Sequence, residues 1–362
     1  MVLALLRLAL AICLSLWIYK YIVRYFTSGL MDDDAKRAKT DMKSFADSYV
    51  IESDDKDTLE PKNFPDTFEG FGYKFNAFGQ LRHITTGEPF QFEVRDDHVY
   101  NQRRYEAIGE LVDDYVYNLL VEEGGLKKLN IPIDSHGEEP TTFIFHSDDA
   151  FTNERIVILI HGTGVVRAGQ WARRLIINDS LNSGTQLPFI KRAKGLGYGV
   201  IVLNTNDNKR EVKGSTVRIR GSETAENHGN YVWKNVILSK AVAKHIAIVA
   251  HSYGGIVTVN LCKSFPESFQ KRVFAVAFTD SPHSLVNQGI PRAVISWLRK
   301  IARNWVCSQL PLNSFLSTMD SFEVECYSAG TNRHDYTSWM SFPCIYEFID
   351  EQYRKALMQT EL

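Results

Sequence analysis

The stretch IVAHSYGGIV, residues 248–257, joins two apolar runs through His-Ser-Tyr-Gly-Gly. It resembles the nucleophile elbow G-x-S-x-G, with Ala250 in place of the first glycine. Small residues flank the serine in that motif because the backbone packs against itself at the turn from strand to helix. The apolar residues on either side predict a buried strand before Ser252 and a helix after it. We therefore interpret Ser252 as a candidate nucleophile.

From residue 141 onward, apolar runs bounded by turn residues alternate with segments of helical periodicity. The expected strands are TTFIFH (141–146), RIVILIHG (155–162), YGVIVLN (198–204), HIAIVAHS (245–252), RVFAVAFTD (272–280) and FEVECYSAG (322–330). The expected helices are Leu187–Leu196, Tyr231–Ala243, Gly255–Lys263, Arg292–Trp305 and Pro343–Met358. Near-continuous apolar strands are typical of a parallel sheet covered on both faces. We predict an α/β-hydrolase-like fold with a mostly parallel sheet and helices on both faces.

An N-terminal extension precedes this core. Residues 64–100 alternate aromatic with polar residues, which predicts short strands and hairpins, and residues 105–123 carry one apolar stripe at helical spacing. We assign residues 61–140 to the extension and residues 141–362 to the core. Within the core, residues 204–230 are polar and contain glycine, and we predict a flexible surface loop there.

The first 30 residues are strongly apolar, with Arg7 and Lys20 as the charges in the stretch that ends at Val23. The length is intermediate between a signal peptide and a signal anchor, so residues 1–30 predict one or the other, with membrane contact through residues 2–23. A buried amphipathic helix is the alternative. Residues 31–60 are charged and poor in aromatics, and we predict a linker. A secretory or endoplasmic-reticulum location follows if the segment is a signal.

The net charge of −2 gives no reason to expect direct binding of nucleic acid. The chain has five cysteines and no C-x-x-C pair, so we expect no metal site and no cofactor. The cysteines outside the N-terminal stretch are widely spaced, and we interpret them mostly as buried thiols, with disulfides as the alternative in a secretory compartment.

Candidate partners for the serine follow it in the order that the hydrolase fold requires, namely acid and then base. Asp280 ends the predicted strand 272–280, and His334 follows the predicted strand 322–330. The carboxyl ends of parallel strands form the ligand-binding edge of such a sheet. His334 would remove the proton of Ser252, and Asp280 would orient the imidazole.

Three other residues compete for these roles. His283 is a rival base, although a loop histidine three residues from Asp280 is more often a local hydrogen-bonding partner. His251 precedes the serine, and we expect its side chain to point away from the site. Asp335 is a rival acid, although residues adjacent in sequence seldom meet in the required geometry.

The predicted strand 155–162 ends in His161-Gly162-Thr163-Gly164. In hydrolases such a stretch supplies a backbone N–H to the oxyanion hole, and the residue after the nucleophile supplies another. We therefore expect oxyanion donors at Thr163, Gly164 and Tyr253. A tight turn between strand and helix is the alternative explanation for the glycines.

Arg167, Arg173 and Arg174 surround Trp171 beside this loop. Recognition of an anionic or nucleic-acid partner would use such a cluster. We favour the simpler interpretation, a solvated helix face with Trp171 packed inward.

Several blocks of sequence resemble the argonaute-binding-protein-two domain family over roughly residues 60–350. They include FPDTFEGFGYKFNAFGQLRHITTGEPF (64–90), NQRRYEAIGELV (101–112), LIHGTGVVRAGQWARRLIIN (159–178), VAHSYGG (249–255), TDSPH (279–283) and SAGTNRHDYTSW (328–339). The resemblance implies an α/β-hydrolase-like fold and a cotranscriptional regulator that binds argonaute and links chromatin to alternative splicing, in the nucleus or cytoplasm. It also places the family's nucleophile, acid and base at Ser252, Asp280 and His334.

Two functions therefore remain open at this point. The first is a regulator that uses the hydrolase fold as a binding scaffold for argonaute and for chromatin or splicing factors. The second is an active serine hydrolase of the endomembrane system, acting on an ester, thioester or amide through Ser252. The order of serine, acid and base favours the hydrolase, and the family resemblance favours the regulator.

Overall fold

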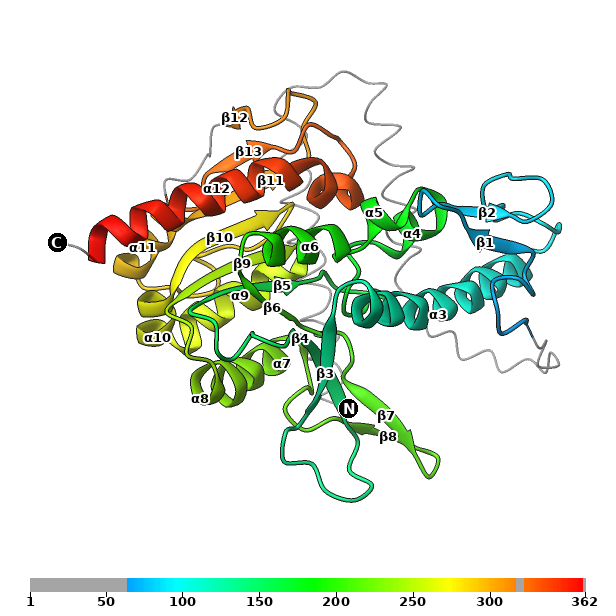
Figure 1. Cartoon of the computed structure of the whole chain (residues 1–362), viewed down its shortest axis with the longest axis horizontal. Helices are drawn as coiled ribbons and strands as arrows, with labels where there is room; N and C mark the ends of the chain where they lie inside the picture. Colours follow the sequence, from blue (N-terminus) through cyan, green and yellow to red (C-terminus); the bar gives the residue numbers. More distant parts are fainter. Residues whose placement is uncertain (1–63, 317–321, 361–362) are drawn as a thin grey trace, which may run out of the picture. The chain divides into compact units, whose positions relative to one another are not determined.

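The computed structural model describes residues 64–316 and 322–360, and within them nine strands form one central sheet of order β12-β13-β11-β10-β9-β5-β6-β4-β3 (Figure 1). Six neighbouring strands from β13 to β6 are parallel, and β12, β4 and β3 join the edges antiparallel. The strands are β3 (Leu126–Ile131), β4 (Thr142–Ser147), β5 (Arg155–Ile160), β6 (Gly199–Val202), β9 (His245–His251), β10 (Val273–Thr279), β11 (Ala302–Val306), β12 (Phe315–Leu316) and β13 (Cys326–Ser328). The predicted mostly parallel α/β sheet is confirmed.

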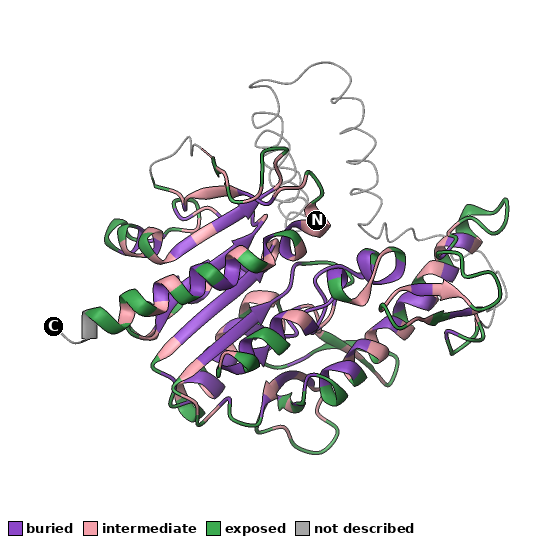
Figure 2. Ribbon diagram, turned by 45° about the horizontal axis from the view of Figure 1, so that its top comes forward, coloured by how far each residue is buried: buried purple, intermediate pink, exposed green. Residues whose placement is uncertain are grey.

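Both faces of the sheet are covered by helices, which explains the continuous apolar strands. In β5, Val157 and Leu159 pack into one layer, and Ile156, Ile158 and Ile160 pack into the other. The first layer contains side chains of α3 (His98–Glu122), α4 (Arg173–Asn178), α6 (Leu187–Gly195) and α12 (Thr337–Thr360). The second contains side chains of α7 (Ala225–Val232), α9 (Tyr253–Ser264), α10 (Pro266–Arg272) and α11 (Arg292–Ile301). The strands in the middle of the sheet are buried along most of their length (Figure 2).

The N-terminal extension contains a short hairpin and the long helix α3. Strands β1 (Tyr73–Phe75) and β2 (Leu81–His83) pair antiparallel, and the carboxylate of Asp97 caps α3 by accepting from Tyr100 N. Ile108, Val112 and Val116 on the apolar stripe of α3 are fully buried. The predicted hairpin and amphipathic helix are therefore present, although α3 begins seven residues earlier than the expected residue 105.

Residues 204–230, for which we predicted a flexible surface loop, contain secondary structure. They contain the antiparallel hairpin of β7 (Lys209–Val212) and β8 (Ser215–Arg218), followed by α7. A π-helical turn, Trp233–Ile237, and the short α8 (Leu238–Lys240) continue α7. The polar composition gave no sign of these elements, because many of the polar side chains form hydrogen bonds within the segment.

The expected helix Arg292–Trp305 is also wrong in its second half. Helix α11 ends at Ile301, and Ala302–Val306 form β11, which pairs parallel with β10 and β13. No turn residue separates the two elements, so the sequence carried no boundary signal. In contrast, α6 and α9 lie within two residues of their predicted bounds.

The predicted signal peptide or anchor at residues 1–30 and the linker at residues 31–60 lie outside the described residues. Among the residues that are described, no helix is both long and apolar enough to span a membrane.

Candidate functional site

The carboxyl ends of the parallel strands bring the candidate residues to one edge of the sheet. The loop His161–Gly164 follows β5, and Ser252 follows β9. Asp280 follows β10, and His334 lies six residues beyond the end of β13. Four segments that are far apart in sequence therefore converge where parallel α/β sheets bind their ligands.

Ser252 occupies the sharp turn between β9 and α9. Its φ and ψ are 50° and −122°, a conformation that side-chain-bearing residues rarely adopt and that is typical of strained functional turns. The glycines after it are required by close packing. A Cβ on Gly254 would lie 2.6 Å from the carbonyl oxygen of Ile160, and a Cβ on Gly255 would lie 1.9 Å from Ser281 Oγ. The backbone therefore makes a sharp, closely packed turn from strand to helix at Ser252.

Asp280 and His334 form a hydrogen-bonded pair, with His334 Nδ1 at 2.7 Å from Asp280 Oδ2. Asp280 also has a positive φ of 45°. Burial opposes the charge on Asp280, but the bond from His334 outweighs it and holds the pKa of the carboxyl below its ordinary value. Burial alone would lower the pKa of His334, but the bond to Asp280 raises it instead. This arrangement orients the imidazole as a general base requires.

Cys307, at the end of β11, holds the same carboxylate. Its backbone N–H donates to Asp280 Oδ1 at 3.1 Å, and its thiol donates to Asp280 Oδ2 at 3.0 Å. Burial, with the charge of Asp280, raises the pKa of this thiol far above its ordinary value, so it stays protonated and remains a donor. We predicted Cys307 only as one of the widely spaced, mostly buried thiols, because the strand β11 before it was predicted as part of a helix.

Ser252 and His334 are brought to the same edge, but within the described residues no hydrogen bond joins Ser252 Oγ to His334. The ring of His251 contacts His334, with the ring centroids 4.7 Å apart. The expectation that His251 points away from the site is therefore wrong. Burial lowers the pKa of His251 to about 3, so this ring is neutral beside His334. Its Nδ1 donates to the carbonyl oxygen of Thr279 at 3.0 Å.

The two rival residues have other partners. His283 is buried, its Nδ1 lies 2.9 Å from Ser281 Oγ, and its ring stacks on Phe278 with centroids 4.2 Å apart. Asp335 accepts a bond from Arg333 at 3.0 Å. The acid that pairs with His334 in the structure is Asp280.

The loop after β5 presents its tip to solvent. Thr163, Gly164 and Val165 are exposed, and Gly164 has a φ of 97°. Gly162 lies against the elbow, because a Cβ there would be 3.0 Å from Ser252 Cβ. Tyr253 begins α9, so its N–H lies at a helix N-terminus, and its hydroxyl donates to Glu226 Oε1 at 2.5 Å.

The arginine cluster divides into different environments. Trp171 is buried, as expected, and Arg174 is exposed. Arg173, however, is buried and ion-paired with Asp113 of α3 at 2.7 Å, so it lies neither on a solvated face nor on a surface open to an anionic partner.

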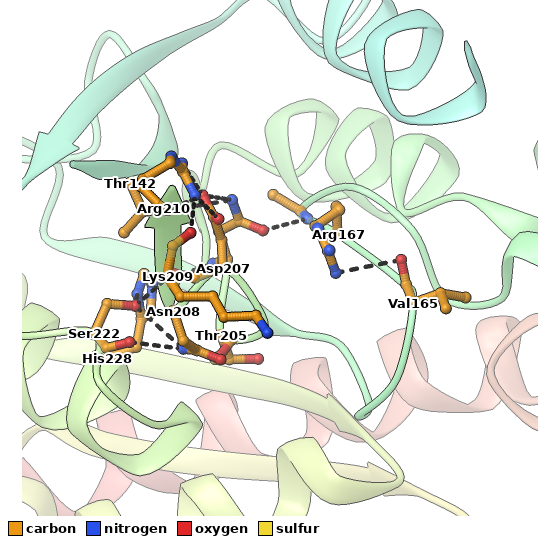
Figure 3. Close-up of polar contacts among 12 residues, drawn as sticks. Thr142, Val165, Arg167, Thr205, Asp207, Asn208, Lys209, Arg210, Ser222 and His228 are labelled. Carbon is orange, nitrogen blue, oxygen red and sulfur yellow. Dashed lines mark hydrogen bonds and ion pairs between the residues drawn. The ribbon is translucent and has the colours of Figure 1, made fainter. Parts of the chain in front are cut away.

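A polar network that the sequence analysis missed follows β6 (Figure 3). Asp207 accepts from Thr142 Oγ1 at 2.6 Å and from Arg210 Nη2 at 2.7 Å. Buried His228 accepts from Asn204 N at its Nε2, so its Nδ1 carries the proton and donates to Ser222 Oγ at 2.9 Å. The run Asn-Thr-Asn-Asp-Asn directly after an apolar strand was the available signal.

A family model and several known proteins match most of the chain. The model of the Arb2 domain family matches residues 64–312. The human protein named cotranscriptional regulator ARB2A is 42% identical over 370 residues, which cover 88% of each chain. The mouse protein of the same name is 44% identical and covers 80% of this chain and 82% of its own. A solved structure titled "A histone deacetylase from Saccharomyces cerevisiae" is 16% identical, with a TM-score of 0.45, over 68% of this chain and 98% of that one.

Proposed function

The chain belongs to the Arb2 domain family, and from that premise we propose that it acts as a cotranscriptional regulator. The observation that supports this proposal is the 42% identity to human cotranscriptional regulator ARB2A over 88% of both chains. The family model matches residues 64–312, which contain the N-terminal hairpin, α3 and the sheet strands from β3 to β11. In this role the fold serves as a scaffold for protein partners in the nucleus or cytoplasm.

Argonaute is the partner that the family resemblance favours, with chromatin and splicing factors in the same assembly. Co-purification of the full chain with argonaute from cells tests it, with Ser252→Ala as the matched variant. We expect both proteins to recover argonaute equally, because the scaffold role does not require the hydroxyl. Failure of the unmodified protein to recover any argonaute would remove this partner from the proposal.

Location is tested on Asn178, which is exposed and begins the sequon Asn-Asp-Ser. The regulator role predicts a nuclear or cytoplasmic protein whose migration does not change on glycosidase treatment. A shift that disappears in Asn178→Gln would place the domain in the secretory pathway and contradict the role.

A second function, hydrolysis of an ester, thioester or amide, is supported by one specific observation. Ser252, with its strained φ, and the hydrogen bond of 2.7 Å between His334 Nδ1 and Asp280 Oδ2 lie at the same carboxyl-terminal edge of the sheet. In this candidate mechanism His334 takes the Ser252 proton as the hydroxyl attacks the acyl carbon, and later returns it to the leaving group. The N–H groups of Thr163, Gly164 and Tyr253 would stabilise the oxyanion.

A fluorophosphonate probe tests this second function directly, because it reacts with activated serines. We expect the full chain to be labelled and Ser252→Ala to remain unlabelled. Equal labelling of the two, or no labelling of either, would exclude an activated Ser252 and leave the regulator role alone.

A further inference from the structure

Asn206 holds both ends of the exposed loop after β5. Its side-chain Nδ2 donates to the carbonyl oxygen of Gly162 at 2.9 Å and to that of Val166 at 3.0 Å. These two carbonyls lie four residues apart and enclose Thr163, Gly164 and Val165. One amide group therefore fixes the separation of the two ends of the loop.

A second donor holds the middle of the loop. Arg173 Nη2 donates to the carbonyl oxygen of Val165 at 2.8 Å, while the same guanidinium is ion-paired with Asp113. Farther along, Asn204 Oδ1 accepts from Ala168 N at 3.0 Å. Side chains from α4 and from the segment after β6 thus bind one short backbone segment, and α3 contributes the carboxylate that holds Arg173.

The loop's backbone carbonyl oxygens and its backbone N–H groups differ in whether they have hydrogen-bond partners. The carbonyl oxygens of Gly162, Val165 and Val166 all accept from these side chains. In contrast, among residues 64–316 and 322–360 no acceptor is bound by the N–H groups of Thr163 and Gly164. Fixing the carbonyls on one side leaves these N–H groups available to an oxygen bound at the elbow, since Gly162 packs against Ser252.

We propose that Asn206 is a positioning residue that holds the loop of residues 162–166 with its N–H groups directed toward the oxyanion of an acylated or phosphonylated Ser252. The proposal rests on the second function above. Asn206 acts through the loop and does not itself contact the reacting atoms.

The neighbours of Asn206 explain why its side chain can serve as a fixed point. Asp207 is bound by Thr142 and Arg210, and Asn208 Nδ2 donates to the carbonyl oxygens of Thr205 and Ser222 at 2.9 and 2.8 Å (Figure 3). The network therefore restrains the backbone on both sides of Asn206. Its side chain then loses less conformational entropy when it binds the loop.

Kinetics of fluorophosphonate labelling test the proposal on the full chain. For Asn206→Ala we expect the rate constant of phosphonylation to fall about 10- to 100-fold, because donors displaced by a fraction of an ångström stabilise the transition state poorly. Reversible binding of the probe, measured as the half-saturating concentration, should stay unchanged. Asn206→Asp should be at least as slow, because a carboxylate cannot donate and would face two carbonyl oxygens.

Asn208→Ala is the matched control, since it removes the same type of side chain two residues away without touching the loop. We expect its rate constant of phosphonylation to fall much less than that of Asn206→Ala, because the loop keeps both hydrogen bonds from Asn206. Equal losses in Asn206→Ala and Asn208→Ala would assign the effect to the whole segment and overturn the specific role of Asn206.

A second measurement does not depend on catalysis. Trypsin cleaves after Arg167, which is half-buried in the held segment, and we expect Asn206→Ala to be cut there at least 10-fold faster than the unmodified protein or Asn208→Ala. If the unmodified chain is not labelled, the hydrolase function fails and cleavage alone decides whether Asn206 holds the loop. Cleavage of Asn206→Ala at the unmodified rate overturns the proposal.

Discussion

His334 Nδ1 lies 2.7 Å from Asp280 Oδ2, and this bond joins two residues that are 54 positions apart in sequence. Because an imidazole nitrogen that faces a carboxylate carries the proton, Nε2 is left as the basic nitrogen. The same bond raises the pKa of His334 above its ordinary value. The pair therefore sets both the tautomer and the basicity of His334. Among the described residues at this edge of the sheet, it is the only histidine with a raised pKa.

Asp280→Asn should disable the pair while preserving its shape. The amide can present its N–H to Nδ1, which would move the proton to Nε2 and remove the base. We expect the pKa of His334, followed by the NMR titration of its ring protons, to fall. Labelling of Ser252 by fluorophosphonate should fall on the order of 10³-fold or more. An unchanged pKa would show that Asp280 does not control this histidine.

Cys307 should tune the pair through the carboxylate that it shares with His334. In Cys307→Ala the thiol donor is lost, so Asp280 keeps more negative charge for the imidazolium and the pKa of His334 should rise. Cys307→Ser restores a donor and should return the pKa toward that of the unmodified protein. If the alanine and serine variants titrate alike, the 3.0 Å contact of the thiol carries no influence on His334.

The sequence predicted the sheet well because its strands are continuous apolar runs, such as Arg155–Ile160, buried on both faces. It also predicted the strand ends at which Ser252, Asp280 and His334 lie, since chain order and strand position are local properties. Chain order also predicted that Asp280 would orient His334, but not the 2.7 Å bond itself, because contact over 54 residues depends on how strands are ordered in the sheet.

Other features failed for identifiable physical reasons. Strand Ala302–Val306 follows α11 with no glycine or proline between them, so helical periodicity was extended through it. In residues 204–230, polar side chains such as those of Asn206 and Asn208 hold the backbone through hydrogen bonds. Polar composition cannot distinguish such a network from a flexible loop.

Gly255→Ala should destabilise the fold by about 1–3 kcal/mol, because the added methyl would overlap Ser281 Oγ. Ser281→Gly in the same chain removes both the oxygen and the Cβ of this contact, so the double variant should recover part of the loss. Urea denaturation of both single variants and the double variant measures the coupling. Gly195→Ala, where the new Cβ meets nothing within 4 Å, is the control and should be close to neutral. Purely additive losses would show that the two residues do not collide.

Lowering the pH from 7.5 to 5 should destabilise the domain, although most carboxylates are still ionised at pH 5. Burial lowers the pKa of four histidines, to about 4 for His161 and to about 3 for His228, His251 and His283. Below about pH 6.5 the unfolded chain binds protons at these positions and the folded chain does not, so stability falls as the pH decreases. At pH 5 each of these histidines therefore lowers the free energy of unfolding by on the order of 1–2 kcal/mol.

His334 has the opposite sign, since its pKa is raised, and the stability that it contributes is present below about pH 6.5 and lost as the pH rises through its folded value. The stability that His334 gains at low pH offsets only part of the stability that the four buried histidines lose. Urea denaturation between pH 7.5 and 5 should therefore show a steep decline in the free energy of unfolding. His228→Gln should have a shallower decline, because one proton fewer is taken up on unfolding. A flat profile in the unmodified protein would mean that these buried rings are protonated in the folded state.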